Sequence, residues 1–363
     1  MTNIGQREKN LRKYADMFVD FSKSEEYRSE VKDREGRVRY FSAALKKEKL
    51  ESMTELDFGE FITKLWAART WTNKEYLIQK MIADNDGLEN IRKHLSDLLH
   101  GRDIFESRYA RFMENVSGFG PGYVTEILCH FNPSEFGIWN NRAREALGAL
   151  GYDDLLPLGK YRITAKEYVH FNKTEKELAK ALGTYGIEIS DLLMLDYFLW
   201  RVSQWRESTP GIEKMEPSKE SHEFDHDEIR DFIKEIGVSL GFEAETEKLV
   251  QHGAKVDVVW RAKIANLGVV MYVFEVHKSG PIDSLVMNLQ KAKKNPSVQK
   301  LIAVSDERQL DKIRKEVKGL PADFVEALSF WDAMDVKNTH QKLSEVVSSI
   351  DRLQLVKSEF EVG

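Results

Sequence analysis

The sequence of 363 residues contains one cysteine, Cys129. An intramolecular disulfide and a CxxC zinc site both need at least two cysteines, so both are excluded. No apolar run approaches the roughly 20 residues that a membrane-spanning helix requires. The first residues, MTNIGQREKN, lack the apolar core of a signal peptide. We therefore expect a cytoplasmic protein with no membrane partner, in which Cys129 is a small buried hydrophobic residue.

Phosphate-loop and serine-hydrolase signatures are also missing. The chain has neither a GxxxxGKS nor a GxxxxGKT segment, and it has no GxSxG turn. Excess positive charge is absent too, because the formal net charge is -6 at pH 7. A nucleic-acid partner would therefore need a local basic face rather than a positive field over the whole protein.

The length and one polar segment predict two domains. A chain of 363 residues exceeds the usual size of a single core. The segment RESTPGIEKMEPSKESHEFDHD, from Arg206 to Asp227, has two prolines, many charges and few apolar residues. We expect an α-helical DNA-binding domain over residues 1–205, a linker over 206–222 and an α/β domain over 223–363.

Apolar spacing predicts the elements of each domain. Before the linker, segments such as FGEFITKLWAA and ENIRKHLSDLLHG have helical spacing, which indicates an all-α domain. After it, the pattern predicts the order α-β-β-β-α-β-α-β, with a helix ending at Gly241 and a short strand near Asp323–Ala327. A helix near Asn338–Ser349 is expected to close the domain.

Two acidic residues lie in neighbouring predicted strands of this second domain. Asp257 lies within AKVDVVW, and Glu275 lies near the end of GVVMYVFEVH, with Ala-Asn-Leu-Gly between the two runs. Adjacent strands of a hairpin bring such residues together. Hard carboxylate oxygens, with the Val276 carbonyl between Glu275 and His277, are ligands that Mg²⁺ prefers. The alternative is two solvent-facing strand carboxylates.

Over roughly Glu223 to Asp351 the chain resembles the PD-(D/E)xK nuclease superfamily, which has the restriction-endonuclease-like fold. The resemblance implies that Asp257 and Glu275 bind Mg²⁺ or Mn²⁺ and that Glu228, in the first helix, lies beside the metal. His277 stands where the family commonly has lysine, so the resemblance leaves cleavage itself open. Many nucleases of this fold act as dimers, which implies a possible homodimer.

A helix after this triplet supplies further candidates for DNA contact. Gln290 lies near the position where some relatives carry a helical glutamine, and Lys293 and Lys294 give the helix a basic end. The alternative for the lysines is a solvated helix terminus that the helix dipole favours.

A glycine-rich turn in the first domain gives a separate signal. The segment VSGFGPGYVTEIL, residues 116–128, resembles the helix-hairpin-helix motif. Its glycines, Gly118, Gly120 and Gly122, allow the backbone to approach a phosphate, while the amides that begin the next helix point at it. The alternative is an ordinary link between two packed helices.

From Phe105 to Tyr152 the chain resembles the helix-hairpin-helix DNA glycosylase superfamily. Asn140 stands at the position of that family's catalytic Asp, and Gly122 at the position of its nucleophilic Lys. We therefore expect DNA binding without base excision. Arg142, Arg144 and Lys160 are candidates for phosphate contacts, or else an ordinary exposed helix face.

The leading hypothesis is a metal-dependent DNA endonuclease that acts on duplex or structured DNA in restriction, defence or repair. The helical domain would hold the backbone, Asp257 and Glu275 would hold the metal, and His277 would orient or deprotonate water. One alternative is a DNA-binding protein with a degenerate nuclease fold. A glycosylase with unusual catalytic residues is the third hypothesis.

Overall fold

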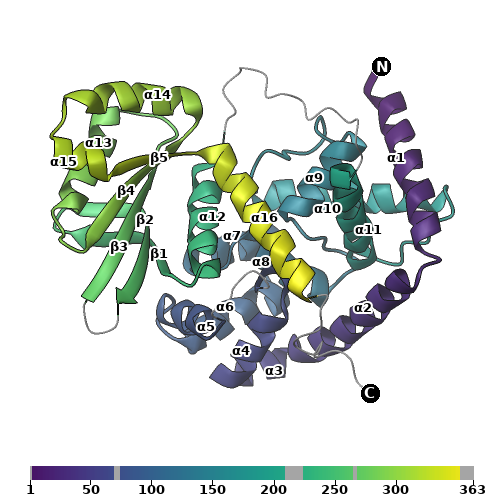
Figure 1. Ribbon diagram of the computed structural model, residues 1–363. Coiled ribbons are helices and arrows are strands. Elements are labelled where there is room, and N and C mark those ends of the chain that lie inside the picture. The colour runs from purple at the N-terminus through teal and green to yellow at the C-terminus, as the bar shows by residue number, and fades with distance from the viewer. Residues whose placement is uncertain (1, 69–73, 209–223, 265–267, 352–363) are drawn as a thin grey trace. The chain divides into compact units, whose positions relative to one another are not determined.

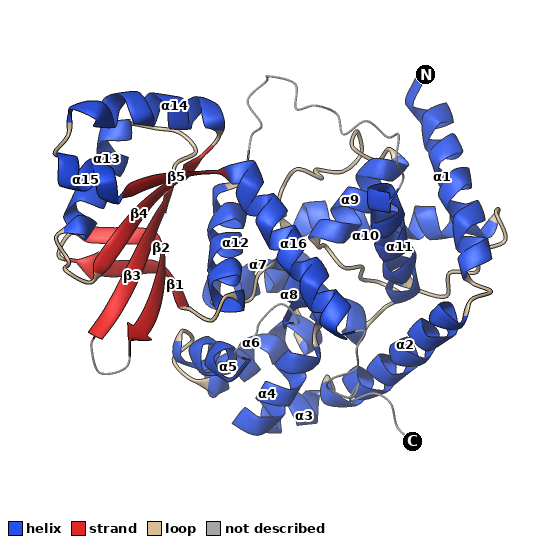
Figure 2. Ribbon diagram, viewed as in Figure 1, coloured by secondary structure: helices blue, strands red, loops and turns tan. Residues whose placement is uncertain are grey.

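The computed structural model describes residues 2–68, 74–208, 224–264 and 268–351 (Figure 1). The chain divides into two compact units, the first within the described residues up to 208 and the second from residue 224 onward. In Figure 2 every strand belongs to the second unit. The protein is thus multidomain, with a largely helical first region and a mixed sheet flanked by helices in the second.

The helices of the first unit follow the apolar spacing of the sequence. They are α1 Thr2–Phe21, α2 Glu25–Ala44, α3 Lys47–Ser52, α4 Glu55–Lys64, the 3-10 helix η1 Trp66–Ala68, α5 Lys74–Ala83, α6 Leu88–His100, α7 Phe105–Asn115, α8 Pro121–Phe131, α9 Asn141–Leu150, α10 Ala165–Gly183 and α11 Leu192–Ser208. Their core is rich in aromatic rings; for example, Tyr109 of α7 stacks on Tyr168 of α10. Cys129 is fully buried in α8, as expected.

The predicted linker begins three residues too early. Residues 206–208 still belong to α11, which ends at Ser208. The sequence explains this end, because Thr209 precedes a proline, and the residue before a proline is disfavoured in helical conformation. The rest of the predicted linker, residues 209–222, lies outside the described part of the chain.

The second unit is built on a five-stranded sheet in the order β1-β2-β3-β4-β5. The first three strands pair antiparallel, and β3, β4 and β5 pair parallel. The elements are α12 His226–Ser239, β1 Glu243–Gln251, β2 Ala254–Ile264, β3 Gly268–Val276, α13 Ile282–Lys293, β4 Val298–Ser305, α14 Glu307–Glu316, η2 Val317–Gly319, α15 Ala322–Ala327, β5 Leu328–Asp332 and α16 Ala333–Asp351.

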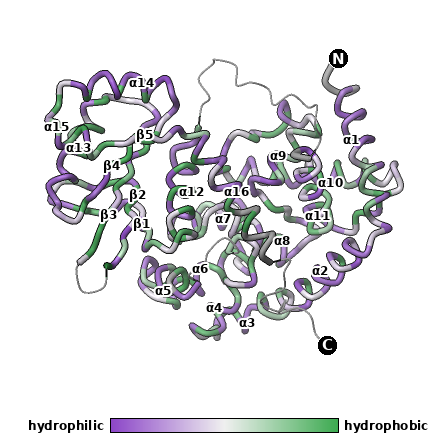
Figure 3. The backbone as a smooth tube through the Cα atoms, in the orientation of Figure 1, coloured by the Kyte–Doolittle hydropathy of each residue, from purple (hydrophilic) through white to green (hydrophobic). Residues whose placement is uncertain are grey.

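Helices cover both faces of this sheet (Figure 1). On one face, Val259 and Val273 pack with Leu285 and Leu289 of α13 in a core that α14 and α15 extend. On the other face, α12 contacts β1 and β2, and its Ile233 carbonyl accepts a hydrogen bond from the Trp260 indole at 2.9 Å. Figure 3 shows α14 as mostly hydrophilic, which fits a helix with only its inner side in the core.

The predicted order of elements is found, with one correction. The segment expected as a strand near Asp323–Ala327 is the short helix α15, and the strand follows it as β5. Phe324 and Ala327 lie three residues apart and are both buried, which is helical spacing. The pattern changes to strand only at Leu328. The predicted helix end at Gly241 agrees with its φ of 88°, a left-handed conformation that favours glycine.

One glycine sets how closely α12 approaches the sheet. A Cβ at Gly237 would overlap the indole ring of Trp260 on β2. We expect Gly237→Ala to destabilise the second unit by about 1–3 kcal/mol, because the added methyl overpacks a filled core. Thermal unfolding measures the effect. Gly319→Ala is the matched control, since open space surrounds that position. Equal melting temperatures for Gly237→Ala and the wild type would contradict the prediction.

Candidate functional site

Asp257 and Glu275 face each other on adjacent strands. In the β2–β3 ladder, Val258 is opposite Phe274, so the next position places Asp257 opposite Glu275. Val259 and Val273, two residues away on each strand, pack against α13. Because side chains alternate between the faces of a strand, the carboxyl group of Glu275 also lies on the α13 face. The sequence prediction that the hairpin brings them together is confirmed.

Contact between the two carboxyl groups and their different surroundings shift their pKa values in opposite directions. Glu275 is 9% exposed, and the two side chains are hydrogen-bonded to each other. Burial, followed by the negative charge of Asp257, raises the pKa of Glu275 to about 9. Burial also acts to raise the pKa of Asp257, but hydrogen bonds from His226 and from the Val276 amide outweigh it and lower that pKa. At neutral pH, Glu275 is therefore the protonated donor and Asp257 the charged acceptor.

Sequence reasoning missed His226. It is the first residue of α12, and its Nε2 lies 3.5 Å from Oδ2 of Asp257. The hydrogen bond to Asp257 raises the pKa of the imidazole. The available signal was the helix start itself, because Asp225 is an N-cap that accepts the Glu228 amide at 3.0 Å.

Asn288 of α13 is the second missed residue. Its Nδ2 donates to Oε1 of Glu275 at 2.5 Å and to the Lys255 carbonyl at 2.6 Å. The expected helical residue was Gln290, two positions later. Two positions correspond to about 200° around an α-helix, so Gln290 and Asn288 project from opposite sides. The structure therefore brings Asn288 to the carboxylates, and contact of Gln290 with DNA stays a prediction.

Glu228 does not lie beside the carboxylate pair. It is fully buried, and its Oε2 is 2.6 Å from Nζ of Lys337 in α16. Glu228 is two residues after His226, again about 200° around the helix, so only one of the two can face Asp257. The structure gives this place to His226 and uses Glu228 as an internal ion-pair partner between α12 and α16.

Val276 contacts the carboxylate pair through its amide, whose N–H donates to Oδ2 of Asp257 at 2.8 Å.

His277 follows directly after β3, and the residue is 8% exposed. Its Nε2 is buried and has no hydrogen-bond partner among the residues that the structure describes. Burial lowers the pKa of the imidazole, and the charged groups acting on it are Asp306 and Lys312. The role predicted for His277 at the attacking water stays a prediction, and Nε2 is shielded from solvent in this structure.

A third acidic residue extends the row onto β1. Thr246 is opposite Val258 and Lys248 opposite Val256, which places Glu247 opposite Asp257. Glu247 has a φ of 52°, an uncommon conformation for a non-glycine residue. Its carboxylate accepts from Nζ of Lys255 at 2.6 Å and lies 3.5 Å from Arg230 of α12. The cationic side chains of Lys255 and Arg230 therefore lie beside Glu247, next to the carboxylate pair.

The donor set fits a divalent cation in its chemistry. Within the described ranges, no group of three His, Cys, Asp or Glu side chains is arranged to hold a metal ion. Two carboxyl groups in contact, with Glu275 buried and Asp257 partly buried, nevertheless need a compensating positive charge when both ionise. A hard divalent cation would supply that charge through the same oxygens.

The glycine-rich segment, residues 116–128, begins with a turn at residues 116–120 that joins α7 to α8. Asn85 holds this turn, because its side chain bonds both the amide and the carbonyl of Ser117, at 2.7 and 2.9 Å. Gly118 has a φ of 81°, so the turn needs glycine there. A Cβ at Gly120 would lie 2.6 Å from the Tyr161 hydroxyl, whereas Gly122 borders open space.

The residues after the hairpin have structural roles. Asn140 is the N-cap of α9 and accepts the Ala143 amide at 2.8 Å. Arg144 is buried, and its guanidinium donates to the carbonyls of Leu158 and Lys160. The prediction that Arg144 belongs to a DNA-contacting face is thus corrected, because its donors are used inside the fold.

The remaining basic candidates lie at element ends. Arg142 is half-buried in α9, and its charge acts on Glu145 and on the buried Asp196. Lys160 pairs with Glu167 at 2.5 Å. Lys293 ends α13, and Lys294 is its exposed C-cap. Contact of these residues with DNA stays a prediction.

Comparison with known proteins gave no relative. No family model matches the chain, and no curated protein or solved structure shows significant similarity to it. Among the residues that the structure describes, no helix combines the length and apolar character needed to cross a membrane.

Proposed function

We propose that this protein is a metal-dependent DNA endonuclease whose second unit has a restriction-endonuclease-like fold. The observation that carries the proposal is the pair of Asp257, which is partly buried, and Glu275, which is buried; they face each other on adjacent strands. The order of elements and the positions of both acids in β2 and β3 support the fold. Restriction, defence and repair are the proposed settings.

Asp257 and Glu275 would hold one or two Mg²⁺ or Mn²⁺ ions, with the Val276 carbonyl as a further ligand. When bound, the cation would lower the pKa of water and polarise a phosphodiester. His226 and the Val276 amide fix the orientation of the Asp257 carboxylate, while Asn288 fixes Glu275. Such supporting contacts tune a site as much as its direct ligands do. His277 is left out of this chemistry because its Nε2 is buried.

The direct test is cleavage of supercoiled plasmid and of branched or modified DNA by the full chain in Mg²⁺ or Mn²⁺. We expect nicked or linear product in at least one metal and none in EDTA. If neither metal supports cutting of any substrate, the proposal of catalysis fails. Continued binding of these DNAs would then establish the second candidate, a DNA-binding protein without cleavage. That candidate is favoured by the lack of a third side-chain ligand among the described residues.

Lys255 is the proposed source of positive charge for the phosphate. It precedes Asp257 by two residues on the same face of β2, and its side chain is exposed. We expect Lys255→Met to lower the cleavage rate about 10- to 100-fold, which is the effect of one lost charge contact of about 1.4–3 kcal/mol. Rates are compared with Lys263→Met, at the far end of the same strand. An unchanged rate for Lys255→Met would exclude this role.

A further inference from the structure

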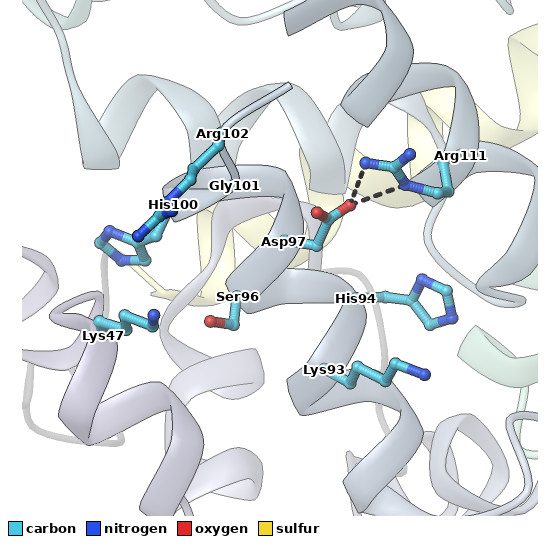
Figure 4. A pocket seen from close by; sticks show the side chains of 9 residues that line it. All are labelled: Lys47, Lys93, His94, Ser96, Asp97, His100, Gly101, Arg102 and Arg111. Carbon is cyan, nitrogen blue, oxygen red and sulfur yellow. Dashed lines mark hydrogen bonds and ion pairs between the residues drawn. The ribbon is translucent and has the colours of Figure 1, made fainter. Parts of the chain in front are cut away.

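The first unit buries a carboxyl group that the proposed function does not use. Glu175 of α10 is 1% exposed, and its Oε2 is buried with no hydrogen-bond partner in the described part of the chain. Figure 4 shows the ordinary arrangement elsewhere in this unit, where the half-buried carboxylate of Asp97 is bonded to the guanidinium of Arg111 at 2.8 and 2.9 Å. Among the described residues, the charged group that acts on Glu175 is instead another acid, Asp196.

The loop between α8 and α9 is shaped around the Glu175 carboxyl group. A Cβ at Gly137 would lie 1.6 Å from Oε2 of Glu175, so only glycine lets the loop pass this closely. Two other side chains of α10 hold the loop in place. Asn172 accepts a hydrogen bond from the Gly137 amide at 2.9 Å, and the Tyr168 hydroxyl donates to the Gly137 carbonyl at 2.8 Å. The carboxyl group is therefore enclosed between α10 and this loop.

Asp196 of α11 is a second buried acid beside Glu175. Burial, followed by the charge of Glu126 in α8, raises the pKa of Asp196 to about 7. The charge of Arg142 and a hydrogen bond with the Asn140 side chain act in the opposite direction. Glu126 itself accepts two backbone N–H groups of η1, at 2.6 and 2.9 Å. The acids on α8 and α11 thus have polar partners, whereas Oε2 of Glu175 has none among the described residues.

The remaining titratable groups around the two acids cannot compensate a negative charge. They are Cys129 of α8, Tyr168 of α10 and Tyr197 of α11, and burial raises the pKa of each. A thiol and a phenol are neutral when protonated and negative when they ionise. An ionised Glu175 would therefore be a buried charge without a counter-ion.

We infer that Glu175 keeps its proton in the folded first unit at neutral pH, and that loss of this proton loosens the packing of α8, α10 and the loop at Gly137. Glu175 is thus a pH-sensitive lock within the fold. Burial of an unpaired charge is costly, whereas a neutral carboxyl group is tolerated far better. This lock depends on neither DNA nor a metal, so it stands whether or not the second unit cleaves DNA.

The sign of the pH effect follows from burial, which raises the pKa of Glu175 well above its usual range. In the unfolded chain the group titrates near a pKa of about 4.3. The stabilisation from Glu175 is therefore fully present below the pKa of the unfolded chain, and it is lost as the pH rises past the pKa of the folded protein. The buried His130 acts with the opposite sign, but its pKa is lowered, so its effect ends near the ordinary pKa of about 6.5.

Cys129 reports on this opening in the full chain. It is the single cysteine, it is fully buried in α8, and both Glu175 and Asp196 act on it. A thiol reagent modifies only an exposed thiolate, so the modification rate in denaturant divided by the rate in the folded protein at the same pH gives a protection factor. We expect the wild-type factor to fall about tenfold from pH 7 to pH 8, because release of one proton on opening changes that equilibrium tenfold per pH unit.

The test variants are Glu175→Gln and Glu175→Met, which keep the approximate size of the side chain but do not titrate. We expect their protection factors to change by less than about twofold over the same window. Glu177→Gln, at an exposed position of α10, is the matched control and should keep the wild-type fall. Circular dichroism checks that each variant folds. A constant wild-type factor from pH 7 to pH 8, or an equal fall in the wild type and in either folded Glu175 variant, would overturn the inference.

Discussion

Asp257→Asn and Glu275→Gln are each expected to lower metal-dependent DNA cleavage by about a thousandfold or more. A bound cation at such a site is worth several kcal/mol, and each 1.4 kcal/mol is about tenfold in rate. Both substitutions remove a charged oxygen ligand but keep the size and hydrogen-bonding capacity of the side chain. Initial rates of plasmid cleavage in Mg²⁺ and in Mn²⁺ measure the effect.

The matched control for this pair is Asp283→Asn, which removes an exposed carboxylate from the first turn of α13. Its cleavage rate should stay near that of the wild type. DNA affinity, measured in EDTA by anisotropy, should be unchanged in all three variants, because the lost step is chemical. Retention of cleavage by either site variant would show that the carboxylate pair is not the active site.

The stability of the second unit in EDTA is expected to fall as pH rises from about 5 to about 9. The pKa of Glu275 is raised in the folded protein to about 9, because of burial and then the Asp257 charge. In the unfolded chain the group titrates near an ordinary pKa of about 4.3. Between these values the folded state holds the extra proton, so each rise in pH favours unfolding. The stabilisation from Glu275 is therefore fully present below the pKa of the unfolded chain, and it is lost as the pH rises past the pKa of the folded protein.

Glu275→Gln should remove the part of this pH dependence that Glu275 causes, because an amide replaces the protonated carboxyl without titrating; the raised pKa of His226 contributes a further fall of the same sign. At pH 8 we expect the variant to be more stable than the wild type by about 1–3 kcal/mol, less than the full pKa difference implies because the pair titrates together. The lowered pKa of Asp257 has the opposite sign, but it acts only below about pH 4, outside this window.

Calorimetric unfolding at pH 5, 7 and 9 measures the effect, with Glu316→Gln as a control at an exposed carboxylate of α14. Addition of Mn²⁺ should recover stability of the wild type at high pH, since binding to the folded state alone stabilises it. A wild-type stability that is flat or rising over this range would show that Glu275 is charged in the folded protein.

Two side chains from outside the hairpin contact the carboxylate pair. His226 contacts Asp257, and Asn288 donates a hydrogen bond to Glu275. They come from α12 and α13, which cover opposite faces of the sheet. The carboxylates thus lie at the end of the sheet, where side chains from the helix layers on both faces can contact them. This placement explains why a two-strand pattern in the sequence is enough to locate the acids but not their partners.

The sequence alone determined the elements whose pattern is local. Two apolar runs rich in Val, Tyr and Phe, with a short polar break between them in the sequence, specify β2 and β3, and hairpin geometry then places Asp257 opposite Glu275. The glycine turn before α8 and the helix end at Gly241 follow from backbone conformations that glycine favours. These features need only interactions between residues close together in the chain.

Tertiary structure decided what lies around those elements. Whether Glu228 or His226 faces Asp257 depends on how α12 is rotated about its axis as it packs on the sheet, and the same holds for Asn288 and Gln290 on α13. Arg144 looks like a surface charge in the sequence, but the loop carbonyls that bury it lie 14 and 16 residues away. The local sequence pattern determines which residues lie on the same side of a helix. Contacts between distant segments determine which of those sides faces the carboxylate pair.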